Sequence, residues 1–313
     1  MTDYLITGGA GFIGSNLAEY LVSQGHSVRV FDNFSTGKRQ NLRGFETKAE
    51  IIEGDLRDVD QVKRAMAGVR YVLHLAAIAS VPRSVVDPQM THEANVTGTL
   101  NVLLAARDAN CRRVVFSSSS SVYGETPTLP KREDMMPAPL SPYAVHKITG
   151  EYYCRIFWQL YGLETISLRY FNVFGPRQDP QSQYAAVIPR FITAILRDEP
   201  PTIFGDGHQS RDFSHVENVI TGNLAACDAP QQALGESFNI ASGDRITLLD
   251  LIATINAIVG KNITPKFGPP RPGDVLHSQA DVGKAAKLLG WTPRGNFGDG
   301  IEKVVAWYRQ QSE

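Results

Sequence analysis

The stretch Tyr4-Leu5-Ile6-Thr7-Gly8-Gly9-Ala10-Gly11-Phe12-Ile13-Gly14 joins a short apolar strand to the first turn of a helix. Glycine permits a tight turn, lets a phosphate approach the backbone and lets the helix pack closely on a sheet. The helix N-terminus then offers free N–H groups and a positive dipole end to a pyrophosphate. The glycine spacing differs from the commoner G-x-G-x-x-G, but the strand before it and the helix after it supply the right context. The stretch therefore predicts a dinucleotide-binding turn.

Short apolar strands and amphipathic helices alternate over the first 170 residues. We expect strands at 4–7, 28–32, 50–53, 69–75, 113–118 and 165–170, and helices at 12–24, 58–67, 91–110 and 141–161. Near-continuous apolar strands separated by helices indicate a parallel sheet that is covered on both faces. The prediction is an α/β fold with a doubly wound Rossmann domain, which binds ligands at the carboxyl ends of its strands.

The composition of the sequence changes after Asn172, where proline and glycine become frequent and the expected strands are few and short. We expect helices at 185–197, 247–259, 281–289 and 300–310. The predicted organisation is a Rossmann domain over 1–171, joined by about 211–241, and a smaller mixed α/β substrate-binding domain over 172–210 and 242–313. Because no repeat or low-complexity linker separates them, we expect the two parts to pack tightly.

The bulk composition is that of an ordinary globular protein. The 313 residues carry a formal net charge of −1, which gives no electrostatic case for binding nucleic acid or an anionic membrane. Cys111, Cys154 and Cys227 show neither metal-ligand nor disulfide spacing, so we expect buried free thiols, no metal site and a reducing compartment. No apolar run reaches transmembrane length and no secretory signal is visible. We expect a cytoplasmic protein.

The ends of the next strands suit a dinucleotide. Asp32 ends the second strand, where a carboxylate accepts hydrogen bonds from adenosine ribose hydroxyls and repels a 2′-phosphate. That placement favours NAD over NADP, although Lys38 and Arg39 just beyond leave a 2′-phosphate open. Asp55-Leu56 follows the third strand, where it can touch adenine. The fourth strand ends in His74-Leu75-Ala76-Ala77, whose small residues leave room for the cofactor and whose histidine we expect to pack structurally.

Tyr143 and Lys147 lie four residues apart in the helix predicted for 141–161, so their heads share one face. Ser141 can cap this helix. An ammonium beside a phenol favours the phenolate, which gives a proton-transfer centre near neutral pH. Alone, the pair is equally typical of a surface helix with its lysine in solvent. The fifth strand ends in the serine run 117–121, at the same edge of the sheet, and this favours the catalytic interpretation.

Taken together, these motifs resemble the extended short-chain dehydrogenase/reductase family, and within it the nucleotide-sugar (UDP-hexose or UDP-N-acetylhexosamine) 4-epimerases. The resemblance covers nearly the whole chain. It also rests on three later segments: Arg169-Tyr170-Phe171-Asn172-Val173-Phe174-Gly175-Pro176-Arg177, Arg211-Asp212-Phe213 and Arg271-Pro272-Gly273-Asp274. It implies an isomerase that epimerises a UDP-sugar at C4 through a transient 4-keto sugar, with NAD as cofactor. Because the hydride returns to the same sugar, the net reaction is redox-neutral.

The resemblance also implies roles for single residues. Tyr143 would take the proton of the sugar 4-hydroxyl, Lys147 would hold the nicotinamide ribose and Ser119 would bond the 4-oxygen. Ser120 and Ser121 are alternatives to Ser119. The implied cofactor site comprises Gly8, Gly11, Phe12, Ile13, Gly14, Asp32, Asn33, Ser35, Thr36, Gly37, Asp55, Leu56, Leu75, Ala76, Ala77, Asn95, Ser117, Tyr143, Lys147 and Tyr170. The implied substrate site comprises Ser119, Ser120, Tyr143, Asn172, Val187, Phe204, Arg211, Phe213, Arg271, Asp274 and Ser278.

The choice of sugar depends on the room near its C2 substituent. Ser278 aligns with a position where related glucose-only enzymes carry a bulky tyrosine, so a small side chain there is expected to admit an N-acetyl group. The segment 80–84, Ser-Val-Pro-Arg-Ser, resembles the branch that uses N-acetylhexosamines. The expected substrates are therefore UDP-N-acetylglucosamine and UDP-N-acetylgalactosamine together with UDP-glucose and UDP-galactose.

Other activities share this fold and its Tyr/Lys pair. Related 4,6-dehydratases carry Thr-Asp-Glu where this chain has three serines at 119–121, and serines cannot do carboxylate chemistry. A UDP-glucuronate decarboxylase or epimerase and a keto-sugar reductase stay open at the level of the fold. A non-catalytic NAD-sensing regulator predicts loss of Tyr143 or Lys147, and both are present. The family also implies a homodimer formed through the helices predicted at 91–110 and 143–161.

Overall fold

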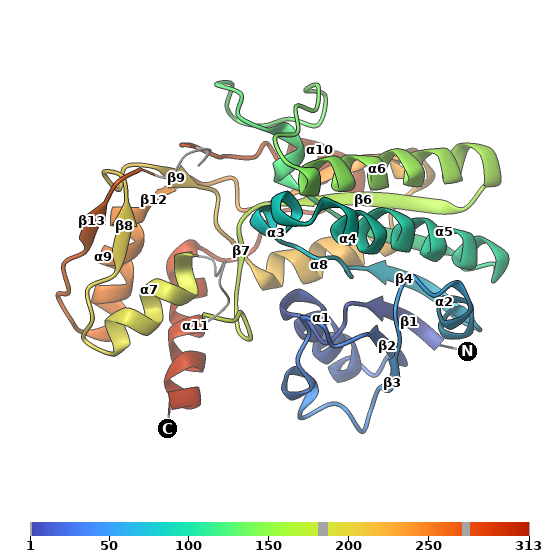
Figure 1. The fold of residues 1–313 in the computed structure, drawn as a ribbon, viewed down its shortest axis with the longest axis horizontal. Coiled ribbons are helices and arrows are strands. Elements are labelled where there is room, and N and C mark those ends of the chain that lie inside the picture. The colour runs from blue at the N-terminus through green and yellow to red at the C-terminus, as the bar shows by residue number, and fades with distance from the viewer. Residues whose placement is uncertain (1, 181–186, 271–275, 313) are drawn as a thin grey trace.

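A seven-stranded parallel sheet forms the centre of the computed structural model, which describes residues 2–180, 187–270 and 276–312. The strand order is β11-β6-β5-β4-β1-β2-β3, and every neighbouring pair is parallel. Figure 1 labels β6, β4, β1, β2 and β3 of this sheet. The strands are β1 (Thr2–Thr7), β2 (Val28–Asp32), β3 (Glu50–Glu53), β4 (Val69–His74), β5 (Arg113–Ser119), β6 (Glu164–Tyr170) and β11 (Ser237–Ile240). The order reverses between β1 and β4, so the predicted doubly wound α/β fold is confirmed.

Helices cover both faces of this sheet, because its strands are apolar on both sides. One face packs on α1 (Phe12–Ser23), α8 (Val216–Cys227) and α10 (Gly283–Leu289). The other face packs on α2 (Val59–Met66), α5 (Gly98–Asp108) and α6 (Pro142–Tyr161). The three cysteines are free and buried within these layers, as expected.

Helix α6 begins and ends where its sequence predicts. The side chain of Ser141 accepts a hydrogen bond from the backbone N–H of Ala144 at 3.2 Å, and Pro142 occupies the first helical position. Gly162 ends the helix in the left-handed conformation, with φ of 70°. These ends fix which residues of α6 face the sheet.

The helix predicted at 91–110 differs from the structure. It begins earlier, as α4 (Pro88–His92), passes through a π-helical turn η2 (Glu93–Thr97) and continues as α5. Within the turn, Asn95 accepts from the Ile78 N–H at 2.8 Å and donates to the Ile78 carbonyl at 3.3 Å. The extra residue of a π turn reorients a side chain without ending the helix, which periodicity cannot reveal. The short helix α3 (Val81–Val86) was also not predicted.

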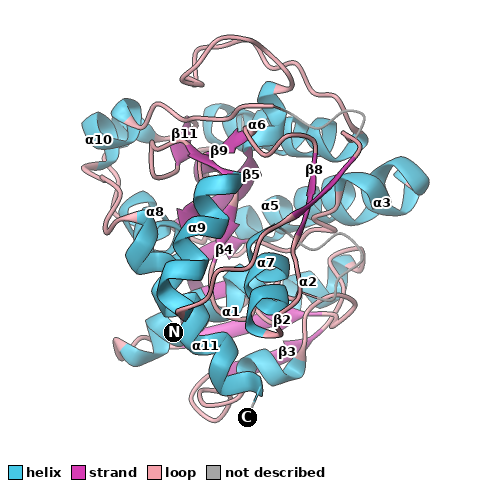
Figure 2. Cartoon of the chain, turned by 90° about the vertical axis from the view of Figure 1, so that its left-hand side faces the viewer, coloured by secondary structure: helices cyan, strands magenta, loops and turns pink. Residues whose placement is uncertain are grey.

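The later part of the chain builds a further apolar cluster. Its helices lie beside the main sheet (Figures 1 and 2). It contains α7 (Val187–Leu196), α9 (Leu248–Val259) and α11 (Phe297–Ser312). Three small sheets pair β7 (Val173–Phe174) with β10 (Ser214–His215), β8 (Thr202–Phe204) with β13 (Lys266–Gly268), and β9 (Ser210–Arg211) with β12 (Ile246–Thr247). The remaining short helices are η1 (Arg39–Leu42), η3 (Ser120–Tyr123) and η4 (Gln231–Ala233).

Strand β11 pairs with β6, so the segment around 211–241 adds a strand to the main sheet. The two-domain boundaries themselves stay a prediction. Within the described residues, no helix has the length and apolar character needed to cross a membrane. In the same part of the chain, no group of three or more histidine, cysteine, aspartate or glutamate side chains could hold a metal ion.

Candidate active site

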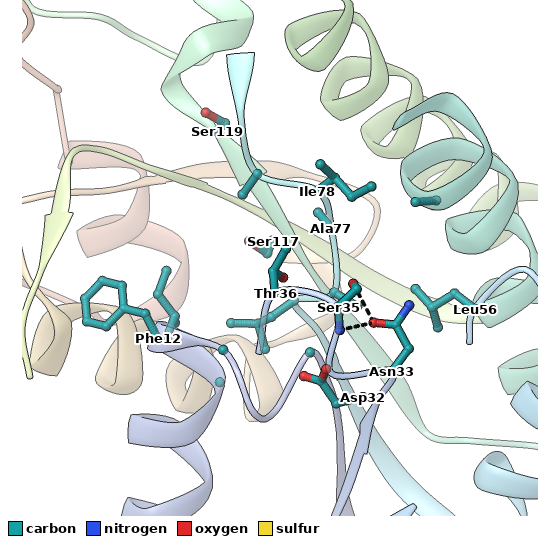
Figure 3. Close-up of a pocket in the computed structure, with 18 of the residues that line it drawn as sticks. Phe12, Asp32, Asn33, Ser35, Thr36, Leu56, Ala77, Ile78, Ser117 and Ser119 are labelled. Carbon is teal, nitrogen blue, oxygen red and sulfur yellow. Dashed lines mark hydrogen bonds between the residues drawn. The ribbon is translucent and has the colours of Figure 1, made fainter. Parts of the chain in front are cut away.

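A cavity of about 870 Å³ lies at the carboxyl ends of the main-sheet strands (Figure 3). The turn after β1, the end of β2, the loop after β4 and the serine run of β5 all contribute to its wall. The predicted cofactor residues that line it are Gly8, Gly11, Phe12, Ile13, Gly14, Asp32, Asn33, Ser35, Thr36, Asp55, Leu56, Leu75, Ala76, Ala77, Ser117, Tyr143, Lys147 and Tyr170. The fold thus gathers residues that lie as far apart in the sequence as Gly8 and Tyr170 around one cavity.

Two predicted cofactor residues lie behind the wall of this cavity. Gly37 packs on Asp32, since a Cβ at Gly37 would lie 2.9 Å from either carboxylate oxygen. Asn95 holds the backbone of Ile78, which does line the cavity. Both residues therefore shape the cavity wall from behind.

The glycine turn has the tight geometry that a dinucleotide site needs. Gly8 has φ of +70°, a left-handed conformation that favours glycine. A Cβ at Gly14 would lie 2.2 Å from the Gly8 carbonyl oxygen, so the helix and turn meet more closely than any side chain permits. No side chain caps α1 at Gly11, which leaves the first-turn N–H groups available at the cavity. This arrangement fits the pyrophosphate of a dinucleotide.

The end of β2 fits a ribose without a 2′-phosphate. The Asp32 carboxylate accepts from the Ala10 N–H at 2.9 Å and from the Phe34 N–H at 2.8 Å, and burial raises its pKa. Lys38 and Arg39 are the two cations that could bind the 2′-phosphate of NADP. Lys38 pairs with Asp179 at 2.6 Å. Arg39, the other, pairs with Glu53. With both cations neutralised and a carboxylate at the ribose position, the surroundings favour NAD.

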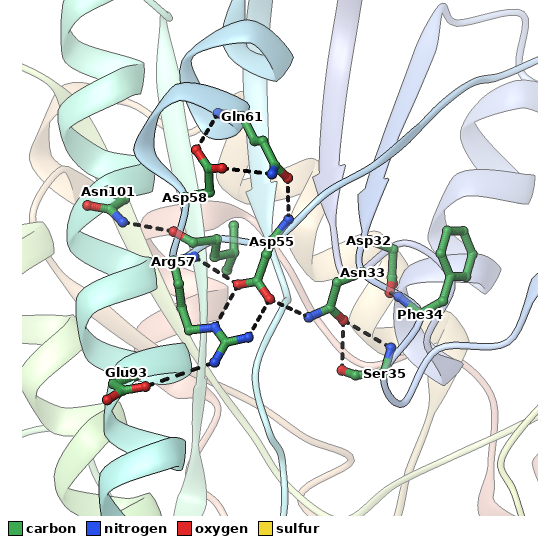
Figure 4. Close-up of polar contacts among 11 residues, drawn as sticks. Asp32, Asn33, Phe34, Ser35, Asp55, Arg57, Asp58, Gln61, Glu93 and Asn101 are labelled. Carbon is green, nitrogen blue, oxygen red and sulfur yellow. Dashed lines mark hydrogen bonds and ion pairs between the residues drawn. The ribbon is translucent and has the colours of Figure 1, made fainter.

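A chain of hydrogen bonds organises the end of the cavity where we expect adenine (Figure 4). The Asp55 carboxylate accepts from Arg57 Nη2 at 2.8 Å and from Asn33 Nδ2 at 3.0 Å. Hydrogen bonds from Arg57 hold the pKa of this carboxyl well below its usual range. The Asn33 carbonyl then accepts from the Ser35 N–H at 3.0 Å and its hydroxyl at 2.7 Å. Asp55 is therefore held in place by protein partners, which give this part of the cavity wall a defined shape.

The Tyr143/Lys147 pair lies at the other end of the cavity. Lys147 Nζ is 5.8 Å from the centre of the Tyr143 ring and donates to the Ser117 carbonyl at 2.6 Å. Burial lowers the pKa of Lys147 to about 8, and the charge of Glu151 opposes this. Burial raises the pKa of Tyr143 to about 12, and a hydrogen bond with Ser119 opposes this.

The expectation of a readily ionised phenol is therefore wrong for the protein alone. The ammonium donates to a backbone carbonyl, and burial raises the pKa of the phenol because the phenolate loses its water. A positive charge inside the cavity would act in the opposite direction and favour the phenolate.

The serine run separates into distinct environments. Ser119 and Ser120 line the cavity, and Ser119 contacts the Tyr143 side chain. Ser121 Oγ is buried, lacks a hydrogen-bond partner and lies outside the lining. Among the three candidates for the 4-oxygen contact, Ser119 thus has the most suitable placement. His74 is buried between Thr7 and Thr99, and burial lowers its pKa to about 3, in line with a structural role.

A second cavity of about 240 Å³ adjoins the first, because Asn172 and Val173 line both. Its other predicted substrate residues are Val187, Phe204, Arg211 and Phe213. Ser278 lines neither cavity, but its hydroxyl lies 3.2 Å from Asn172 Nδ2. The predicted contacts Arg271 and Asp274 fall outside the described residues.

Sequence reasoning missed several residues that line the larger cavity, including Ile78, Arg83, Met90, Arg177, Gln178 and Asp179. They come from α3, α4 and the loops after β4 and β7. Arg83 and Arg177 lie in segments whose family resemblance was noted, and this resemblance was the available signal. No local pattern marks the others, because only the fold brings them to the strand ends.

Known proteins resemble this chain over nearly its full length. The NAD dependent epimerase/dehydratase family model matches residues 4–241. A UDP-glucose 4-epimerase of Mycolicibacterium smegmatis is 39% identical, with 99% of each chain covered. A solved UDP-N-acetylglucosamine 4-epimerase from Methanobrevibacter ruminantium M1, in complex with UDP-N-acetylmuramic acid, is 40% identical, with a TM-score of 0.94 over 99% of this chain and 100% of that one. A UDP-glucuronic acid 4-epimerase from Bacillus cereus, solved with UDP-glucuronic acid and NAD, is 34% identical, with a TM-score of 0.90 over 99% and 100%.

Proposed function

The chain belongs to the NAD dependent epimerase/dehydratase family, and on this premise we propose that it is a UDP-sugar 4-epimerase. One observation carries the proposal: the cavity that suits NAD ends at Tyr143, Lys147 and Ser119 and adjoins a second cavity that suits a nucleotide. Full-length similarity to 4-epimerases of three UDP-sugars supports the reaction type. The predicted family and its cofactor, NAD, are thereby confirmed, whereas the individual roles of the site residues stay proposals.

In this proposal, bound NAD supplies a two-electron acceptor and donor at its nicotinamide ring. Tyr143 takes the proton from the sugar 4-hydroxyl as C4 is oxidised and returns it when C4 is reduced from the other face. Ser119 holds the 4-oxygen, and Lys147 places a positive charge beside the reacting centre. Proton and electron pair both return to the sugar, so the balance closes without any other reactant.

The substrate half of the proposal uses the second cavity. Phe204 and Phe213 offer apolar walls to a uracil ring, and the Arg211 guanidinium suits a diphosphate through its planar fork of donors. The nucleotide is then held on one side of Asn172 and Val173, while the hexose lies near Tyr143 and can turn. We propose UDP-N-acetylglucosamine and UDP-glucose, with their 4-epimers, as substrates.

The direct test incubates the purified chain, without added NAD, with UDP-glucose, UDP-N-acetylglucosamine and UDP-glucuronic acid in turn. Proton NMR measures the products. The proposal expects UDP-glucose and UDP-N-acetylglucosamine each to convert toward an equilibrium mixture of 4-epimers. A 4-keto-6-deoxy product would indicate a dehydratase, and release of carbon dioxide from the uronate would indicate a decarboxylase. Either product in place of the epimers would overturn the assignment.

Ser278→Tyr is expected to remove activity on N-acetylated sugars and to retain activity on UDP-glucose. The serine hydroxyl lies next to Asn172, where the two cavities meet, so a bulky ring there would occupy the space near the sugar C2 substituent. We expect kcat/KM for UDP-N-acetylgalactosamine to fall by about 10²-fold. Ser278→Ala is the control, because it removes the same hydrogen bonds without adding bulk. Equal losses on both sugar types would contradict the specificity role.

We also propose that the chain forms a homodimer through α5 and α6. Helix α6 exposes Val145, Tyr152, Ile156 and Leu160, whose spacing places them along one face. The family resemblance selects a second copy as the partner of this face. Light scattering at micromolar concentration is expected to give twice the 34.4 kDa chain mass. A mass of one chain would refute the dimer.

A further inference from the structure

The serine run connects the catalytic pair to a buried carboxylate that lies outside the reacting centre. Ser117 accepts from Lys147 through its carbonyl. The Ser118 hydroxyl donates to Glu151 Oε1. Ser119, the next residue, meets Tyr143. Three consecutive residues of β5 therefore contact α6 at three points, and the central contact is with Glu151.

The Glu151 carboxylate joins four elements of the fold. Arg169 of β6 donates to it twice, from Nε at 2.9 Å and from Nη2 at 2.7 Å. Ser237 of β11 donates to Oε2 at 2.9 Å, and Ser118 of β5 donates to Oε1. The side chains of Glu151 and Arg169 are each only 4% exposed. The carboxylate accepts four hydrogen bonds, so both of its oxygens are paired. This pairing offsets the cost of burying the group away from water.

Glu151 lies one helical turn beyond Lys147, and its charge favours the ammonium of that lysine. The other titratable groups facing Lys147 are Tyr143 and His146 on α6 and His74 on β4. Burial lowers the pKa of His146 to about 4 and that of His74 to about 3, so both are neutral at pH 7. Among these described neighbours, Glu151 is the group that counteracts the desolvation of Lys147.

We propose that Glu151 is a positioning residue for the reaction, one that holds the carboxyl end of β5 against α6. It thereby brings the backbone and the hydroxyls of the serine run onto the Tyr143/Lys147 pair. The kinetic consequence rests on the proposed epimerase function, whereas the consequence for the Lys147 charge does not.

Ser118→Ala and Ser237→Ala form a matched pair of variants. Each removes one hydroxyl donor from the same carboxylate and leaves the ion pair with Arg169 in place. The proposal expects Ser118→Ala to lower kcat about tenfold with little change in KM, because β5 loses its link to α6. The kcat of Ser237→Ala, on β11, is expected to stay within about twofold of wild type. Both variants should lower Tm by a similar amount, because each removes one hydrogen bond to the same carboxylate. Equal activity of the two variants would overturn the positioning role.

Glu151→Gln tests the charge. Without the carboxylate the pKa of Lys147 is expected to fall, so the alkaline limb of the kcat/KM profile should move at least about half a unit to lower pH. NMR of Nζ-labelled lysine measures the same change without any turnover, with Lys147→Arg for assignment. An unshifted Lys147 titration would refute this part, and Glu151→Met, which is also neutral and of similar size, replaces the variant if Glu151→Gln does not fold. Inactivity of the wild type would instead count against the epimerase proposal.

Discussion

Tyr143→Phe is expected to lower kcat for epimerisation by about 10³-fold, the middle of the range for loss of a positioned acid–base group. The substitution removes one oxygen atom from a half-buried ring and leaves its packing unchanged. The Ser119 hydroxyl, which contacts the phenol, would remain at the cavity and could still hold the sugar oxygen. NAD binding should therefore persist while proton transfer is lost.

The pH dependence of the wild type follows from the same pair. Burial raises the pKa of Tyr143 to about 12, so these surroundings alone keep the phenol neutral at neutral pH. Burial lowers the pKa of Lys147 to about 8, so its positive charge is present below that pH and lost above it. A positive charge beside the phenol, such as that of a bound nicotinamide, favours the phenolate. Activity that needs both this phenolate and a charged Lys147 should then rise toward neutrality and decline above about pH 8.

The control for Tyr143→Phe is Tyr20→Phe, which makes the same chemical change at an exposed position of α1, outside the cavity lining. It should retain wild-type kcat. Initial rates on UDP-glucose measure kcat, and the absorbance of released cofactor measures NAD content. If Tyr143→Phe turned over at the wild-type rate, another group would have to move the proton, and the proposed mechanism would be lost.

The sheet was largely predictable because its strands are local features. The bounds predicted for β2 and β3 agree with the structure residue for residue, since each is a short apolar run that ends at a polar side chain. The start of α6 was predictable for a different reason: Ser141 caps the helix through its own side chain. Such local chemistry can be recognised without knowing the fold.

Features that depend on distant partners were not predictable. The sequence around the π turn at 93–97 has the pattern of one continuous helix, so the turn leaves no local signal. The hydrogen bonds of Asn95 join it to Ile78, 17 positions earlier in the chain. The environment of Glu151 is assembled from β5, β6 and β11, and nothing in its neighbouring residues marks a buried carboxylate. The pKa direction of Tyr143 was wrong because spacing on a helix shows that two heads share a face, but not where the ammonium points.

The small sheets of the later part show the same limit. Strands of two or three residues, such as β7, β9 and β12, carry no periodicity. They are defined by their pairing, and each pair joins segments that lie more than 30 residues apart. Asn172 and Val173, where the two cavities meet, therefore owe their placement to contacts that only the fold creates.

Gly14→Ala is expected to destabilise the protein by about 2–3 kcal/mol and to remove most of its NAD. The added Cβ would lie 2.2 Å from the Gly8 carbonyl oxygen and 2.7 Å from the Gly9 Cα, and both of these are backbone atoms. No side-chain rotation can relieve such contacts, so the turn must move away from α1. The moved segment is the one whose N–H groups suit the pyrophosphate, and cofactor binding should therefore fall together with stability.

Two further alanine variants make this a graded test. At Gly11 a Cβ would lie 3.2 Å from the same Gly8 oxygen, so a smaller shift and a smaller loss of stability are expected. Gly298 lies in α11, outside the cavity lining, and a Cβ there would lie 3.2 Å from Asn296 Oδ1. Gly298→Ala should therefore leave NAD content unchanged. Urea unfolding measures the stability loss, and cofactor absorbance after denaturation measures bound NAD. Wild-type NAD content in Gly14→Ala would mean that the turn tolerates a side chain there, and the close contact of helix and turn could not be what shapes the cofactor site.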